Sequence, residues 1–337
     1  MRVWSVVRDD KPMLGVCNRI AVMLQLLSLC ALLLLTPPVY AANEPDAQVW
    51  LAEMRFAMSH LNYRGTVTYS RNNQIEILRV YHGVVDGVEH ERILSVNSPM
   101  REVIREQGKV TCYFPESRSL STKESGRERP FLRDLPEDLN GLARYYVIKP
   151  GEAGVVAQRS AHLIAIDPRD AYRYKRALWV DDETRLPLKY ELIDENGNVI
   201  EQMLFSDLSL EKKLPASDLA ASTHPDASWT VKHNENLPAD KLRWTLSNVP
   251  EGFGLTSYTR LKRGGSEHEI DHILLSDGLS SVSVYTEELP GEGLSTHRRK
   301  MGAISLYARQ IGNYQITVLG EVPFKTVKAI GDGIHAP

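Results

Sequence analysis

Apolar residues recur along the first part of this chain with two different periods. Helical spacing comes first, behind a capping Asp46, where one apolar stripe joins Trp50, Met54, Ala57, Met58 and Leu61. After Gly65 the period shortens to two, and short segments rich in β-branched and aromatic residues alternate with turn residues. The pattern predicts a helix followed by strands over residues 66–69, 75–82, 88–94, 101–107 and 109–114.

The alternation stops and then resumes. Residues 116–129 are polar and predict a loop, and residues 136–145 predict a helix. Strand patterns follow over 161–166, 172–180, 188–193 and 198–205, with a strong hairpin turn at 195–198. Nine strands at hairpin spacing predict an antiparallel meander that is large enough to curl strongly or close.

A second unit follows a break in the pattern. Apolar periodicity fails over residues 210–228, where Pro215 and Pro225 indicate a linker. Strand patterns then return over 244–246, 255–262, 269–275, 281–287 and 315–319, and a closing helix begins at Pro323. We therefore expect an N-terminal domain over 43–209, a linker over 210–228 and a C-terminal domain over 229–330.

The first forty residues differ from the rest. Residues 1–20 are basic, residues 21–35 are almost entirely apolar, and small residues lead to Ala41 and Ala42. This order predicts a Sec-type signal peptide over 1–41, cleaved after Ala41 or Ala42. A retained membrane anchor is the alternative, but fifteen apolar residues span about 22 Å, short of the ~30 Å hydrocarbon core.

Composition sharpens this picture. The 337 residues carry a formal charge of −3. Residues 1–42 hold four of the 40 basic and two of the 43 acidic residues, so the remaining 295 residues have 36 basic and 41 acidic side chains, a net charge of −5. This balance argues against nucleic acid as a partner. Cys112 is the one cysteine among these 295 residues, so they cannot form an intramolecular disulfide.

One enzyme motif matches by its letters. His268, Glu269 and His272 fit H-E-x-x-H, which binds zinc when both histidines lie on one face of a helix. A glycine pair at 264–265 and turn residues at 276–278 bound this segment, which favours a strand. On a strand, Glu269 points away from both histidines. A zinc hydrolase stays a distant alternative. The acidic residues at 181–183 are interpreted as a hairpin tip.

Several segments spread over residues 50–330 form a recognisable series: 63–66, 101–105, 166–174, 178–181, 201–205, 276–284, and 320–323 followed by 326–327. In this order, they together resemble the MucB/RseB family of periplasmic regulators of an envelope-stress sigma factor. The resemblance implies an α+β fold: a strongly curved antiparallel sheet, an unclosed barrel similar to LolA and LolB with plugging helices, and a smaller α/β C-terminal domain.

The resemblance also implies a function without catalysis or a cofactor. Family members bind the periplasmic part of a MucA/RseA-type anti-sigma factor and protect it from site-1 proteolysis. Lipopolysaccharide or other lipids are expected to release it. A periplasmic lipid or lipoprotein carrier of the LolA type is the alternative, and the oligomeric state is left open.

Candidate binding residues follow from the strand pattern and from one turn. Val67, Tyr69, Ile77 and Val80 are candidates for the lining of a lipid cavity, although the pattern does not tell the inner face of the sheet from the outer. Arg169 and Arg173 are candidates for binding an anion or an acidic partner segment. Their alternative role, which the neighbouring Asp167 and Asp170 favour, is to pair with those aspartates and fix a turn.

Overall fold

The computed structural model describes residues 46–124, 135, 139–233, 236–262, 269–289 and 296–336. The chain divides into two compact units, residues 1–44 and 45–337, and every described residue belongs to the second. The predicted signal peptide and its cleavage site lie outside the described residues. Within the described part, no helix has the length and apolar character needed to cross a membrane.

The predicted N-terminal helix is α2 (Ala47–His60). Asp46 caps it, because its carboxylate accepts a hydrogen bond of 2.9 Å from the backbone N–H of Gln48. Met54, Ala57 and Met58 of the apolar stripe are buried, as is Leu51. These side chains belong to the main hydrophobic cluster, so α2 packs against the first sheet through the face that the sequence predicted.

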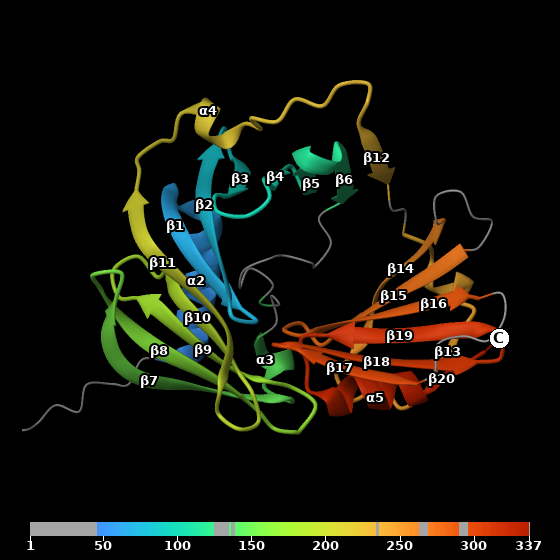
Figure 1. The fold of residues 1–337 in the computed structure, drawn as a ribbon. Helices are drawn as coiled ribbons and strands as arrows, with labels where there is room; N and C mark the ends of the chain where they lie inside the picture. Colours follow the sequence, from blue (N-terminus) through green and yellow to red (C-terminus); the bar gives the residue numbers. More distant parts are fainter. Residues whose placement is uncertain are drawn as a thin grey trace, which may run out of the picture. The chain divides into compact units, whose positions relative to one another are not determined.

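The described residues build one large sheet of twelve strands, which curves strongly and stays open (Figure 1). Its order is β12-β6-β5-β4-β3-β2-β1-β11-β10-β9-β8-β7, so β12 and β7 form the two ends. All neighbours pair antiparallel except β12 and β6, which are parallel. The strands are β1 (Tyr63–Arg71), β2 (Gln74–Val85), β3 (Val88–Ser95), β4 (Glu102–Glu106), β5 (Lys109–Phe114), β6 (Ser119–Glu124), β7 (Tyr146–Val156), β8 (Arg159–Pro168), β9 (Lys175–Asp181), β10 (Pro187–Ile193), β11 (Val199–Leu210) and β12 (Thr230–His233).

Two segments of this sheet differ from the prediction. Residues 119–124 are the strand β6 and not a loop, because a strand that pairs through its backbone needs no apolar alternation. The strand β7 has no counterpart in the prediction, because Pro150 and two glycines interrupt its pattern at a register shift. The predicted helix over 136–145 is the single turn α3 (Leu139–Leu142), with 136–138 outside the described residues.

The segment expected to be a linker is fastened to the first sheet. It contains the short helix α4 (Ala216–Leu219), and Leu214 and Leu219 are buried. The Glu102 carboxylate accepts hydrogen bonds from the backbone N–H groups of Ser222 (2.8 Å) and Thr223 (2.9 Å). Residues 230–233, expected in the C-terminal domain, form β12 and pair with β6 of the first sheet.

The second sheet has six antiparallel strands in the order β14-β15-β16-β19-β18-β17 within the described residues. Figure 1 shows α5 (Phe324–Asp332), the predicted closing helix, beside β18 and β19. Val327 and Ile330 of α5 join Val284, Ile316 and Val318 in one hydrophobic cluster. The strands are β14 (Gly254–Lys262), β15 (Glu269–Ser276), β16 (Ser281–Glu288), β17 (His297–Met301), β18 (Ile304–Ile311) and β19 (Tyr314–Gly320), with a two-stranded sheet of β13 (Thr245–Leu246) and β20 (Ile334–His335) and the 3-10 turns η1 (Pro115–Ser117) and η2 (Ala239–Lys241).

The strands β17 and β18 were not predicted. The first consists almost entirely of exposed charged residues and lies at the edge of its sheet, where charge is common. The expected class nevertheless holds: the fold is α+β, with a large, curved, unclosed antiparallel sheet and a second, smaller sheet domain.

Candidate functional site

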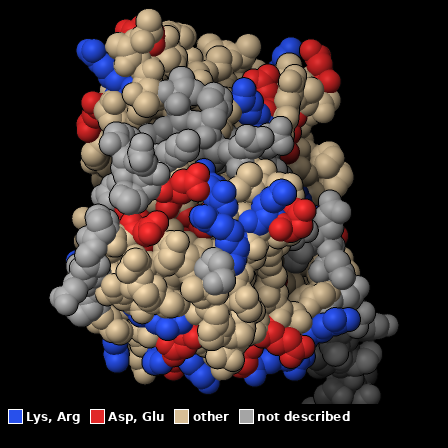
Figure 2. Space-filling view, turned by 90° about the vertical axis from the view of Figure 1, so that its right-hand side faces the viewer, with Lys and Arg blue, Asp and Glu red and all other residues tan. Residues whose placement is uncertain are grey.

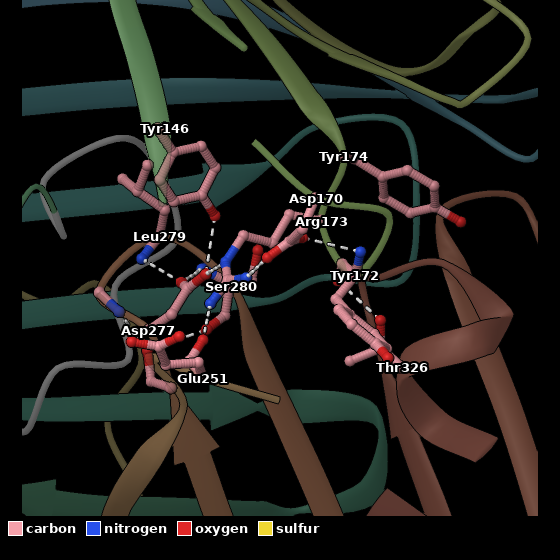
Figure 3. Close-up of polar contacts among 12 residues, drawn as sticks. Tyr146, Asp170, Tyr172, Arg173, Tyr174, Glu251, Asp277, Leu279, Ser280 and Thr326 are labelled. Atoms are coloured by element: carbon pink, nitrogen blue, oxygen red, sulfur yellow. Dashed lines mark hydrogen bonds and ion pairs between the residues drawn. The ribbon is translucent and has the colours of Figure 1, made fainter. Parts of the chain in front are cut away.

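The two predicted anion-binding arginines occupy different environments. Arg169 is exposed, and its Nε donates to the Ala143 carbonyl oxygen at 3.0 Å. Arg173, in the loop between β8 and β9, is only 3% exposed. Its Nε donates to the Asp277 carboxylate at 2.6 Å, and its terminal nitrogens donate to Asp170 and to the Glu251 carbonyl oxygen (Figure 3). All three nitrogens of Arg173 therefore have partners inside the protein.

Asp277 is the fully buried counterpart of Arg173 in the loop between β15 and β16. One of its oxygens, Oδ2, also accepts from the Tyr146 hydroxyl at 2.8 Å. The other, Oδ1, accepts from the backbone N–H groups of Leu279 (2.9 Å) and Ser280 (2.6 Å). Burial raises the pKa of the Tyr146 hydroxyl, so it remains a donor at every physiological pH.

Aromatic rings enclose the guanidinium of Arg173. Its centre lies 4.8 Å from the ring centroids of both Tyr145 and Phe253. Gly252 has a φ of +92°, and a Cβ there would collide with Arg173 and with the Tyr145 ring. Glycine at this position therefore allows both the left-handed turn and the close approach of the arginine.

Further contacts extend this junction between the first and second sheets. Arg176 on β9 donates to the Leu279 carbonyl oxygen and to the Ser280 hydroxyl, both at 2.8 Å. The Thr326 hydroxyl on α5 donates to the Tyr172 carbonyl oxygen at 2.6 Å (Figure 3). We call Tyr146, Arg173, Arg176, Asp277 and Ser280 the polar junction. It holds the β8–β9 segment against the β15–β16 turn.

The four predicted cavity residues do not share one face of the sheet. Val67 pairs with Leu78 and is buried in the main cluster, and Val80 is buried in the same cluster. Tyr69 is half-buried and packs against it. Ile77 pairs with Thr68, the neighbour of Val67, and so lies on the opposite face. Ile77 therefore cannot line the same cavity as the other three residues.

A small apolar pocket lies on the face that contacts α2. Its cavity volume is about 10 Å³, room for about one water molecule. Val80 is the one predicted candidate among its lining residues. The pocket is lined by Met58, Tyr63, Val80, Glu91, Leu186, Pro187 and Phe205.

The zinc-motif segment is a strand wherever it is described. His268 lies outside the described residues, while Glu269 and His272 are on β15, as the sequence favoured. Asp271 between them accepts hydrogen bonds from Arg243, Trp244, Tyr258 and Arg260. Burial alone would raise the pKa of Asp271, but these hydrogen bonds outweigh it and hold the pKa below its usual value. The Asp271 carboxylate therefore has a structural role, as the shared acceptor of these four donors.

Charges of both signs mix on the surface of the second sheet. Figure 2 shows lysine and arginine side chains directly beside aspartate and glutamate side chains on this face. Ion pairs of this kind join Glu269 to Arg260 at 3.4 Å and to Arg243 at 3.9 Å. The described part of this face therefore does not carry the single-sign field that strong nucleic-acid binding requires.

Two protein-family models match the chain, one in each half. The model of the MucB/RseB N-terminal domain matches residues 46–223, and that of the MucB/RseB C-terminal domain matches residues 238–335. Proteins of this kind pair a large open sheet with a smaller sheet domain. The chain belongs to the MucB/RseB family.

Relatives and solved structures agree with this assignment. The chain is 28% identical over 316 residues to the sigma factor AlgU regulatory protein MucB of Pseudomonas aeruginosa, which covers 92% of this chain and 96% of that protein. It is 27% identical to the sigma-E factor regulatory protein RseB of Escherichia coli K12, covering 87% and 92%. The solved complex of Pseudomonas aeruginosa MucA and MucB matches with a TM-score of 0.71 and 26% identity, covering 86% of this chain and 99% of that one.

Asp277 and Tyr146 of the polar junction were not predicted from the sequence. Asp277 stands in a Ser-Asp-Gly turn, which explains its local hydrogen bonds but gives no sign of a partner 104 residues away in the chain. Tyr146 lies on the unpredicted β7. The one available signal was Arg173 itself, an arginine between two tyrosines in a turn.

Proposed function

We propose that this protein is a periplasmic regulator that binds the periplasmic segment of a MucA/RseA-type anti-sigma factor. Bound in this way, it would shield that segment from site-1 proteolysis and keep the sigma factor sequestered. The observation that carries the proposal is the family match of both domains, together with the likeness to MucB solved with MucA. The predicted signal peptide over 1–41 supports export to the compartment where this segment lies.

Regulation by binding needs no reaction, and we propose that the protein is not an enzyme. Two of its buried carboxylates serve the fold: Asp271 and Asp277 are each saturated by internal donors. Because their hydrogen bonds are already made within the protein, these two carboxylates would not be available to transfer a proton to or from a bound substrate.

Lipid would release the anti-sigma segment by linkage. Each CH₂ group of an acyl chain buried in the first sheet would favour binding by about 0.8 kcal/mol. A lipid that binds better to the free protein than to the complex must weaken the complex by the same factor. Among the predicted candidates, Val80 lines the pocket and would contact the chain directly, whereas Val67 and Tyr69 belong to the surrounding hydrophobic cluster.

Binding of the mature chain to the periplasmic segment of its cognate anti-sigma factor tests the proposal. We expect a stable complex at micromolar concentration by isothermal titration calorimetry, and slower cleavage of the segment by the site-1 protease when the protein is added. Absence of binding together with unchanged cleavage would overturn the regulator and favour the LolA-type carrier, whose diagnostic property is transfer of lipid between vesicles.

A matched pair of variants tests the partner-contact role that we propose for Arg169. Arg169→Glu changes the charge of an exposed residue beside the polar junction, and Lys213→Glu makes the same change on the exposed part of the linker. If an acidic partner segment contacts Arg169, Arg169→Glu weakens the complex more than Lys213→Glu does. Equal affinities of the two variants would remove Arg169 from the interface.

A further inference from the structure

A buried ion pair lies on the face of the first sheet that contacts α2. Glu91 on β3 pairs directly with Arg105 on β4, and the neighbouring pair on the same face is Ile93 with Val103. The Arg105 Nη1 donates to the Glu91 carboxylate at 2.6 Å, and both residues are 4% exposed. A charged pair in this position is unusual, because Ile93 beside it belongs to the main hydrophobic cluster.

Only part of the Arg105 guanidinium has a partner. Its Nε and Nη2 are buried and donate to no partner among the described residues. These two nitrogens form the edge of a guanidinium that binds a carboxylate or phosphate with two parallel hydrogen bonds. The edge that is best suited to an oxyanion is therefore the one that the fold leaves unused.

The other buried arginines of the described chain behave differently. Arg92 donates through Nε to Glu102 and through Nη1 to carbonyl oxygens of the linker. Arg173 has partners for all three nitrogens, and Arg176 donates to two carbonyl oxygens and a hydroxyl. None of these three has a buried nitrogen without a partner. Among these four buried arginines, Arg105 is the one that is not saturated; the half-buried Arg55 on α2 also has one nitrogen, Nη1, without a partner.

The ion pair adjoins the apolar pocket. Glu91 itself lines the pocket, together with Met58, Val80 and Phe205. A buried cation with a free hydrogen-bonding edge therefore lies one residue away from a hydrocarbon-like surface. This combination matches a molecule with an anionic head and an apolar chain.

We propose that the Nε and Nη2 edge of Arg105 binds the carboxylate or phosphate head of an anionic amphiphile whose chain enters the pocket beside Val80. The proposal rests on the lipid-binding part of the proposed function and adds the head-group chemistry and the residue that recognises it. Because the pocket is now small, the chain must displace side chains, and the flexible Met58 is suited to move. Glu91 keeps Nη1 occupied and so orients the free edge.

Binding of decanoate and of 1-decanol to the mature chain tests this inference, because the two share a ten-carbon chain and differ in the head. We expect decanoate to bind at least about tenfold more tightly, since a charge-assisted bidentate contact is added. Arg105→Lys keeps the positive charge beside Glu91 but removes the two-nitrogen edge. This variant should lose the preference for decanoate and keep the affinity for 1-decanol.

Controls separate the other outcomes. Arg144→Lys, at an exposed arginine to which no binding role is assigned, should keep the preference, and thermal melting of each variant verifies that it is folded. Equal affinity for the two probes, or an unchanged preference in Arg105→Lys, overturns the head-group assignment while lipid binding stands. If neither probe binds, both the head-group assignment and the lipid-binding part of the proposed function are overturned. Acetate or inorganic phosphate that binds as tightly as decanoate would show an ion site without a chain, and anti-sigma binding is measured separately on the same variants.

Discussion

At the scale of single residues, Arg173 shows how a side chain that looks suited to a partner can be used within the fold. Its guanidinium meets Asp277, Asp170 and the Glu251 carbonyl oxygen, between the rings of Tyr145 and Phe253. A buried charge of this kind is tolerated only when its hydrogen bonds are complete. Arg173 therefore stabilises the contact between the two sheets and is not available to an external anion.

Removing one partner of this pair should be costly. We expect Arg173→Met to lower the free energy of unfolding by about 3–5 kcal/mol, because Asp277 is left buried with its charge unpaired. Arg169→Met, at an exposed position, should change it by less than about 0.5 kcal/mol. Urea denaturation measures both. The double variant Arg173→Met/Asp277→Asn should lose less than the sum of its single changes, and simple additivity would argue against direct coupling.

At the scale of elements, the linker over residues 210–228 is attached to the first sheet by hydrogen bonds and buried side chains. The Glu102 carboxylate accepts from the Ser222 and Thr223 backbones, and Arg92 pairs with Glu102 at 2.7 Å. Burial alone would raise the pKa of Glu102, but the hydrogen bonds from Ser222, Thr223 and Arg92 outweigh it and lower the pKa. The connection between the two family domains is thus held at a defined place.

Weakening the Glu102 carboxylate as a hydrogen-bond acceptor should loosen the attachment of the linker to the first sheet. Glu102→Gln replaces a charged acceptor of two backbone N–H groups by a neutral amide, so we expect faster hydrogen exchange at Ser222 and Thr223, by about tenfold or more. Glu116→Gln, at an exposed glutamate of the η1 turn between β5 and β6, is the matched control and should leave these amides unchanged. Unaltered exchange in Glu102→Gln would mean that other contacts hold this segment, among them the buried Leu214 and Leu219 and the hydrogen bonds from Arg92.

At the scale of the whole molecule, a carboxylate pair lies at a second contact between the sheets. Glu201 on β11 is 7% exposed, and Glu321 follows β19 of the second sheet. Arg71 on β1 is the register partner of Glu201 and pairs with Glu321 at 3.3 Å. Burial, and then the negative charge of Glu321, raise the pKa of Glu201 to about 7, against the opposing effects of a hydrogen bond from Tyr69 and the charges of Arg71 and Arg176.

The contribution of Glu201 to the stability of the protein should therefore fall as pH rises from about 4.5 to about 7. Folded Glu201 keeps a proton up to about pH 7, whereas the unfolded chain releases it near the ordinary pKa of 4.5. The folded state thus binds more protons between these values, and the free energy of unfolding decreases with pH until it levels off above 7. Glu201→Gln mimics the protonated form, so we expect it to gain about 2–3 kcal/mol at pH 8 and little at pH 4.

Urea denaturation at pH 4, 6 and 8 measures this slope. Glu195→Gln, on the exposed β10–β11 turn, is the control and should keep the pH dependence of the parent. Glu321→Gln should flatten the slope in part, because it removes the repulsion but leaves Glu201 buried. A Glu201→Gln variant with the full parental slope would assign the pH dependence to other groups.

Several elements were predictable from local pattern alone. The apolar stripe fixed the buried face of α2, and the Asp86-Gly87 and Gln107-Gly108 turns adopt the positive φ angles that tight hairpins require. The linker prediction was less complete, because its prolines indicate a break in the pattern but do not reveal that Glu102 binds it. Ile77 shows the same limit, since alternation groups residues by face without telling which face is buried.

The sequence by itself determined the α2 helix, most of the strands, the hairpin turns and the family, because each depends on neighbouring residues or on their order. The tertiary structure decided that Arg173 meets Asp277, that β12 joins the first sheet, and that Arg105 keeps a free edge beside an apolar pocket. These depend on residues brought together from distant parts of the chain. Their geometry is set by the curvature and register of the sheets, which local pattern does not encode.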